Sequence, residues 1–338
     1  MKMKGPCMWI GVTVLALAVS LLAIPTSYAQ KAAGISRVGW LEVCDPGPQR
    51  PHFDIFKGRL AELGYVEGKN LIIEQRFADC RYDRIPGLAT ELVRLPVDVL
   101  FTMHTRAARI VAETVKTTPL VVYSCDPFEH VTELARGHGN LTGVTCMTTE
   151  LSPKRLELLH EVVPEASRVT FLYDPQNAPN ALKVTQEAAR RLGISLQVAQ
   201  VEEAEELLPQ LTTIAKERPD ALFVHPDVFL SSGPRPLQLA EFAIKARLPM
   251  INAFRIFTDA GGLMSYGATT SEIYTSAAEQ VAKVLDGTRP SELPVREATR
   301  FELIINNWTA KTLGLTIPPS LLMRADEVIE SPPPFATH

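Results

Sequence analysis

The sequence predicts an α/β fold made of two successive lobes, each built on a parallel sheet. Short β-rich runs alternate with amphipathic helical stretches of about 10–15 residues, which is typical of βαβ units. This alternation runs through one set of elements and starts again near residue 152. One helix and one strand near the C-terminus are too few to form a third core, so we expect them to return to the two lobes.

The first 29 residues have the pattern of a cleavable signal peptide. Lys2 and Lys4 precede an almost purely apolar run at residues 9–24, and the small residues Ser27 and Ala29 fit a cut after position 29. The alternative is a membrane anchor, but the run is shorter than the ~20 residues that span a bilayer. We therefore expect an exported, periplasmic protein.

Composition narrows the class of protein further. A lipoprotein cysteine would follow the apolar run, whereas Cys7 precedes it, so we expect a freely diffusing protein. The formal net charge is −4 and no basic stripe occurs, which argues against a nucleic-acid partner. About 300 residues remain after cleavage, enough for two domains. No further apolar run is long enough to span a membrane, and we expect a soluble monomer.

The first lobe is predicted from five strands and the helices between them. The expected strands are 37–43, 70–77, 97–102, 119–124 and 141–146, with helices near 51–63, 86–95 and 106–116. In the first helix Phe53, Phe56 and Leu60 share one face, and Gly64 ends it. A flavodoxin-like lobe orders its strands 2-1-3-4-5.

The second lobe repeats the pattern, and the C-terminal elements complete both lobes. The expected strands are 168–173, 196–201, 221–224, 249–253 and 262–265, with helices from Ser152 and near 180–192, 204–218 and 237–247. A helix at 271–285, capped by Ser271, a strand at 301–305 and a short helix at 309–313 follow. We assign 36–147 plus 270–297 to lobe I and 148–269 plus 298–330 to lobe II.

Motifs of enzymes are mostly absent. The chain has no G-x-S-x-G elbow, no P-loop and no G-x-G-x-x-G after the first strand, and its histidines lack metal-ligand spacing. His104 with Cys125 or Asp126 could form a nucleophile–base pair, but polar residues at strand ends are the simpler interpretation. We expect no catalytic residue, no metal and no cofactor.

Polar residues recur just after the predicted strands of both sets. An open α/β sheet binds its ligand at this edge, although a loop Asp also caps helices. The candidate ligand-binding residues are Cys44, Asp45, His104, Thr105, Cys125 and Asp126 in the first set, and Asp174, Asn177, Asn180, Asp227 and Arg255 in the second. Two such edges facing each other make a cleft that can close on a small molecule.

Several stretches resemble a known family over nearly the whole chain after the signal peptide. They are FKGRLAELGYVEGKN (56–70), PLVVYSCDP (119–127), GNLTGV (139–144), KRLELLHEVVP (154–164), AGGLMSYG (260–267), FELII (301–305), TAKTLGL (309–315) and IPPSLLMRAD (317–326). The chain thereby resembles the tryptophan/tyrosine-type substrate-binding proteins of ABC importers, which have the type I periplasmic binding protein fold. The resemblance implies two lobes joined by a three-stranded hinge, one ligand between them and delivery to a membrane permease.

The resemblance also implies roles for individual residues. Asp227 would pair a ligand amino group, while Asn177 and Asn180 lie in the loop that matches the family's Asn/Pro-rich ligand loop. Thr105 and Asp126 fall in the two first-lobe loops that usually face the cleft. Tyr266 lies in the stretch AGGLMSYG (260–267), which the resemblance places at the hinge. His104, Cys44 and Cys125 depart from the family pattern. The expected ligand is a small carboxylate or an amino-acid-like molecule, with its carboxylate held by backbone N–H groups near Thr105.

Four cysteines follow the signal peptide, which permits two disulfides in an exported protein. In the flavodoxin-like order, Cys44 and Cys80 follow neighbouring strands, and so do Cys125 and Cys146. We predict the Cys44–Cys80 bridge, with Cys125–Cys146 as a possible second one. Buried free thiols are the alternative, and the spacing does not fit zinc.

Three functions remain open from sequence. The first is the transport receptor that the resemblance implies. The second is a sensor that presents its ligand to a signalling partner, and the third is a secreted α/β enzyme that uses the same cleft. The missing nucleophile–base–orienter set counts against the enzyme.

Overall fold

The computed structural model describes residues 34–45, 50–124, 128–178 and 180–333 of the chain. The predicted signal peptide, Cys125 and Asp126 lie outside these ranges. Within them, no helix has both the length and the apolar character needed to cross a bilayer.

The first sheet is wholly parallel and has the order β2-β1-β3-β4-β5-β11. Its strands are β1 (Ser36–Glu42), β2 (Leu71–Phe77), β3 (Val99–Met103), β4 (Leu120–Ser124), β5 (Leu141–Thr145) and β11 (Arg296–Glu297). The flavodoxin-like order 2-1-3-4-5 is therefore confirmed. Strands β3, β4 and β5 are buried along their whole length, as expected for a parallel sheet covered on both faces.

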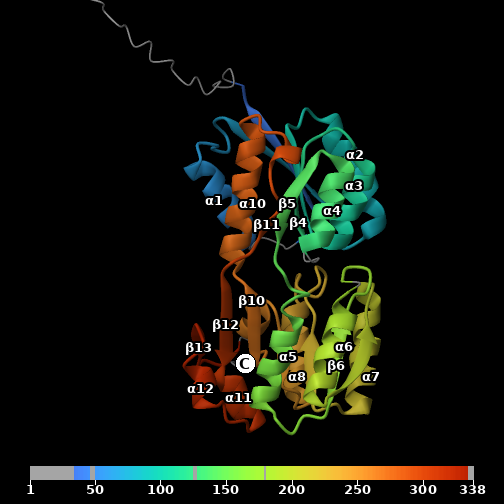
Figure 1. Ribbon diagram of the computed structural model, residues 1–338, viewed down its shortest axis with the longest axis vertical. Coiled ribbons are helices and arrows are strands. Elements are labelled where there is room, and N and C mark those ends of the chain that lie inside the picture. Colours follow the sequence, from blue (N-terminus) through green and yellow to red (C-terminus); the bar gives the residue numbers. More distant parts are fainter. Residues whose placement is uncertain (1–33, 46–49, 125–127, 179, 334–338) are drawn as a thin grey trace, which may run out of the picture. The chain divides into compact units, whose positions relative to one another are not determined.

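Helices cover both faces of this sheet (Figure 1). They are α1 (Pro51–Glu62) and α10 (Thr270–Leu285) on one face, and α2 (Ile85–Arg94), α3 (Thr105–Thr114) and α4 (Phe128–His138) on the other. Trp40 anchors the first face, with ring centroids 5.0 Å from Phe56 and 4.8 Å from Phe101. Helix α4 is missing from the predicted elements, although Phe128, Val131, Leu134 and Ala135 recur at helical spacing in the sequence.

The second sheet has the order β7-β6-β8-β9-β10-β12-β13, and only its β10–β12 pair is antiparallel among the described strands. Its strands are β6 (Arg168–Tyr173), β7 (Ser195–Gln200), β8 (Ala221–Val224), β9 (Met250–Asn252), β10 (Met264–Ala268), β12 (Phe301–Asn306) and β13 (Glu327–Ile329). One core includes α5 (Ser152–Val162), α6 (Ala181–Leu192), α11 (Asn307–Leu313) and α12 (Pro319–Leu322). The other includes α7 (Leu207–Glu217), α8 (Arg235–Lys245) and α9 (Arg255–Asp259). Single 3₁₀ turns lie at Tyr82–Arg84, Ala204–Glu206 and Pro290–Glu292.

The chain passes between the two lobes three times: from β5 to α5, from β10 to α10, and from β11 to β12. Hydrogen bonds tie the last two passages together, because the Glu272 carboxylate accepts from the N–H groups of Thr299 and Arg300. The prediction that Ser271 caps α10 is wrong. Thr269 is the cap, since its Oγ1 accepts from the Glu272 N–H.

Candidate functional site

A cavity of about 360 Å³ lies between the two lobes, at the carboxyl ends of β1, β3 and β4. The first lobe contributes Glu42, Pro51, His52, Met103, His104, Tyr123, Thr270, Ile273 and Tyr274; the second contributes Val228, Ser231, Ser232, Gly233, Phe254 and Ile256. The volume falls within the usual range of small-molecule sites. The position is the edge at which open α/β sheets bind ligands. We call this cavity the interlobe pocket.

A continuous series of aromatic rings forms its first-lobe wall. The ring of His104 lies 5.7 Å from that of Tyr123, and Tyr123 lies 5.7 Å from Tyr274. Tyr274 in turn lies 5.2 Å from His52. These rings come from β4, α10 and two loop–helix junctions, so the wall exists only in the folded chain. Such a wall suits an apolar or aromatic ligand body.

Glu42 brings a negative charge to this wall. Its side chain, in the last residue of β1, is buried, and its Oε2 accepts a 3.0 Å hydrogen bond from Trp40 Nε1. His52 Nε2 lies 3.2 Å from the other carboxylate oxygen. Among the described residues that line the pocket, Glu42 has the only carboxylate, and none is lysine or arginine.

His104 enters the pocket from a strained backbone. It precedes α3 with φ +71° and ψ 142°, a conformation that side chains with a Cβ rarely adopt. Burial lowers the pKa of its imidazole to about 3, with a further contribution from His52. The ring is therefore neutral, and can donate and accept one hydrogen bond each. Strain of this kind is typical of ligand sites.

The strain at His104 leads to a prediction about two variants. We expect His104→Gly to be more stable than His104→Ala by about 1 kcal/mol, because only glycine relieves the positive φ. Both variants remove the imidazole, so ligand affinity should fall equally in both. Urea unfolding and calorimetric titration measure the two quantities. Equal stability of the two variants would show that the backbone is not strained.

A second polar group lies buried beside the pocket, where the lobes touch. Asn177, in the loop after β6, joins the segment after β8 to helix α3 of the other lobe. Its Nδ2 donates to Asp227 Oδ2 at 2.6 Å, and its Oδ1 accepts from the Arg106 N–H at 3.1 Å. Burial raises the pKa of Asp174 to about 7, helped by the nearby charge of Asp227. Burial likewise raises the pKa of Asp227 to about 6, against hydrogen bonds from Phe229 and Asn177. We call Asp174 and Asp227 the carboxylate pair.

The structure thus separates the predicted site residues into groups. His104 lines the interlobe pocket, whereas Asp174, Asn177 and Asp227 meet in the buried group beside it. Both oxygens of Asp227 accept hydrogen bonds from within its own lobe, from Asn177 and from the Phe229 N–H. Asp227 is not among the lining residues of the pocket.

The other described candidates of the first lobe are not among the residues that line the pocket. Cys44 is buried and forms a disulfide with Cys80, with the two Cα atoms 4.3 Å apart, which is the bridge expected from the strand order. Asp45 is exposed, and Thr105 Oγ1 lies 3.0 Å from Ser124 Oγ in the interior. Cys146 is buried, and its predicted bridge involves Cys125, outside the described residues.

The remaining second-lobe candidates lie elsewhere. Asn180 precedes α6. Arg255 is bound to Glu327 and Asp259 at the surface, although its neighbours in the chain line the pocket. Tyr266, in β10, lines a different cavity that also contains Lys154.

Sequence reasoning missed Glu42, His52, Tyr123 and Tyr274. The signal for Glu42 was present, because it is a carboxylate near the end of an otherwise apolar strand that feeds the predicted ligand edge. Tyr274 carried no such signal, since the predicted return of its helix to the first lobe does not tell which of its side chains face the ligand edge.

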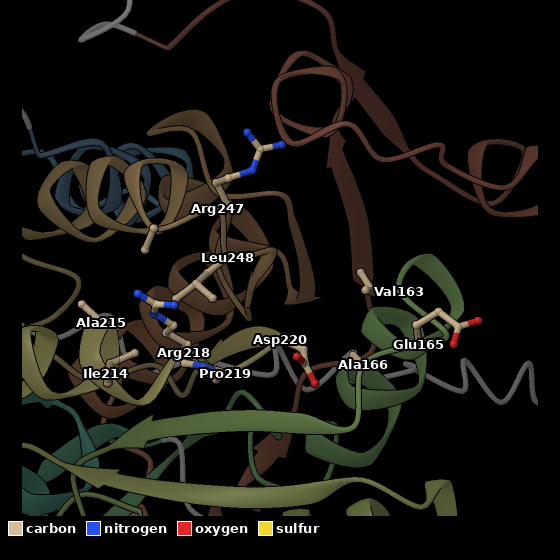
Figure 2. A pocket seen from close by; sticks show the side chains of 11 residues that line it. Val163, Glu165, Ala166, Ile214, Ala215, Arg218, Pro219, Asp220, Arg247 and Leu248 are labelled. Atoms are coloured by element: carbon tan, nitrogen blue, oxygen red, sulfur yellow. The ribbon is translucent and has the colours of Figure 1, made fainter.

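A larger cavity of about 540 Å³ lies in the second lobe (Figure 2). Its lining includes Ala166, Asp220 and Leu248, which precede β6, β8 and β9, so it lies at the amino ends of these strands. In Figure 2 the charged groups of Arg247 and Glu165 lie well apart. Ligands of open α/β sheets bind at the opposite edge, so the interlobe pocket is the stronger candidate.

Comparison with known proteins matches residues 52–329 to the model of a family described as ABC transporter substrate binding protein. A "Tyrosine-binding protein" of Clostridioides difficile (strain R20291) is 23% identical over 294 residues, covering 86% of this chain and 82% of that protein. A conserved domain protein of Vibrio cholerae has a crystal structure that is 25% identical with a TM-score of 0.78, covering 87% of this chain and 99% of that one. An ABC domain from Streptococcus pneumonia, solved in complex with L-Trp, is 21% identical with a TM-score of 0.77, covering 88% of this chain and 100% of that one.

Proposed function

Because this chain belongs to the ABC transporter substrate-binding protein family, we propose that it is exported, loses residues 1–29, binds a small amino-acid-like or carboxylate solute in the interlobe pocket and delivers it to an ABC permease. The observation that carries the proposal is the pocket itself. Both lobes line it, at the edge where open α/β sheets bind ligands.

The pocket offers complementary surfaces to such a solute. The aromatic rings of His52, Tyr123 and Tyr274 cover one side, and Phe254 and Ile256 come from the other lobe. Helices α3 and α10 begin at the pocket, and their N–H groups favour a negative group there. A ligand that contacts both lobes binds the closed arrangement better and shifts the population toward it. The permease then receives the closed, loaded form.

The relatives suggest the first ligands to test, L-tyrosine and L-tryptophan, within a library of amino acids, amines, aromatic acids and sugars. The chain should be expressed with its own leader, and the intact mass of the periplasmic product gives the cleavage site. A ligand that raises the melting temperature at one-to-one stoichiometry and is recovered unchanged supports the proposal. Conversion of the ligand would support an enzyme instead. If none of the compounds stabilised the protein, a binding role would be overturned.

A further inference from the structure

We propose that Glu42 selects ligands of the interlobe pocket by their protonated amino group, and that the pocket therefore takes organic ammonium compounds with an apolar or aromatic body. This inference rests on the proposed function of the pocket and names the chemistry that the pocket requires. It assigns to Glu42 the role that the resemblance implied for Asp227.

The surroundings of Glu42 leave its carboxylate incompletely satisfied. Its side chain is 4% exposed, with Trp40 Nε1 on one oxygen and His52 Nε2 beside the other. A carboxylate offers about four acceptor positions. Burying such a charge is costly unless hydrogen bonds and an opposite charge accompany it. An ammonium group carries three donors and a positive charge, and so supplies both.

The ring series of the pocket favours a cation beside Glu42, and the described lining residues set no basic side chain against it. The ring series from His104 through Tyr123 and Tyr274 to His52 ends beside Glu42. Aromatic faces attract ammonium groups, most strongly in desolvated sites. The described lining residues include no lysine or arginine to pair a carboxylate.

Asp227 is poorly placed for the same task. It is 2% exposed, and its oxygens accept from Asn177 and from the Phe229 N–H. Burial raises its pKa to about 6, which reflects the cost of holding a charge at this interior position. Its position therefore supports the contact between the lobes, whereas Glu42 lies in the wall of the pocket.

Matched probes test the assignment. L-tyrosine, tyramine and 3-(4-hydroxyphenyl)propionic acid share one ring, and differ in whether they carry an ammonium group, a carboxylate or both. We expect L-tyrosine and tyramine to bind and the acid to bind at least about tenfold more weakly, because loss of a charged hydrogen bond in a buried site has this size. The set of L-tryptophan, tryptamine and indole-3-propionic acid extends the test to a larger ring.

The variant Glu42→Gln keeps the shape of the side chain and removes its charge. We expect it to weaken the amines at least about tenfold and to leave the acid unchanged or improved, so that the preference disappears. A merely structural role would weaken all probes alike. Glu74→Gln is the matched control, since Glu74, on β2, pairs with Arg37 of β1 and does not line the pocket.

Two outcomes would overturn the inference while leaving the binding function intact. One is a ligand from the library that lacks an amino group and whose binding is lost when His104 or Tyr274 is replaced. The other is an unchanged preference for amines in Glu42→Gln. Failure of every library compound to bind would overturn the proposed function and this inference together.

Discussion

Replacing Arg155 with methionine should lower the free energy of unfolding by about 3 kcal/mol, because each buried group left without its hydrogen bond costs about 1–3 kcal/mol. Arg155, in α5, is fully buried. Its Nε donates to the carbonyl of Tyr266 at 2.9 Å, and its Nη2 donates to the carbonyl of Thr148. Methionine fills similar space but removes both donors, so the Tyr266 carbonyl loses this hydrogen bond, while the Thr148 carbonyl keeps the one from Ser152 Oγ at 3.1 Å.

The same substitution should loosen the connections between the lobes. Thr148 lies in the passage from β5 to α5, and Tyr266 lies in β10, which leads to the second passage. Arg155 therefore links two of the three passages by hydrogen bonds. Hydrogen exchange should accelerate at residues 146–152 and 264–270 in Arg155→Met, while strands β1 and β3 keep their protection.

Two further variants make this prediction specific. Arg155→Lys keeps the charge but cannot reproduce the planar fork of donors, so we expect no rescue. Arg168→Met is the matched control, because Arg168 donates to the carbonyls of Glu217 and Arg218 at an exposed position. It should change stability by no more than about 0.5 kcal/mol. If Arg155→Met changed the free energy of unfolding as little as the control does, the buried guanidinium would not hold the two passages together.

Much of the fold could be predicted because strand–helix alternation is a local signal. The strands at 168–173 and 221–224 have the predicted bounds, and the strand order of the first lobe follows from the βαβ pattern. Strand β11 could not be predicted, since it has two residues and pairs with β5 only after the chain has passed through the second lobe. The cap of α10 depended on the path of the chain into the helix, which selects Thr269 over Ser271.

The site was less predictable, because a residue's position after a strand does not fix the direction of its side chain. His104 follows β3 and faces the pocket, whereas Thr105, the next residue, lies in the interior against Ser124. Asp227 follows β8, but the Phe229 N–H and Asn177 draw its carboxylate away from the pocket lining. Only the returning helix α10 brings Tyr274 into the wall.

The carboxylate pair should make the protein less stable as the pH rises from about 4 to about 7. Burial raises the pKa of Asp174 to about 7 and that of Asp227 to about 6. The folded chain therefore holds protons that the unfolded chain releases, and stability falls with pH throughout that window. A shift of two units corresponds to about 3 kcal/mol, so the cost of ionising Asp227 is of this order.

Asp174→Asn should remove part of this cost. The amide Oδ1 can still accept from the Gln176 N–H, which now donates to Asp174 Oδ1 at 2.7 Å. At pH 8 the variant lacks one buried negative charge and its repulsion with Asp227, so we expect a gain of about 2 kcal/mol. At pH 4 the wild-type carboxyl is already protonated, and the two proteins should be equally stable. Urea unfolding at pH 4, 5, 6, 7 and 8 measures the difference.

Asp220→Asn provides a control of opposite sign in the same lobe. Although partial burial opposes it, hydrogen bonds from the N–H groups of Arg168 and Ser167 lower the pKa of Asp220. Its carboxylate thus contributes stability that is present above the unfolded pKa and lost in acid, and Asp220→Asn should destabilise the protein at pH 8. If Asp174→Asn gave the same gain at pH 4 as at pH 8, the gain would come from packing. The carboxylate pair would then not be a site of charge repulsion at the contact between the lobes.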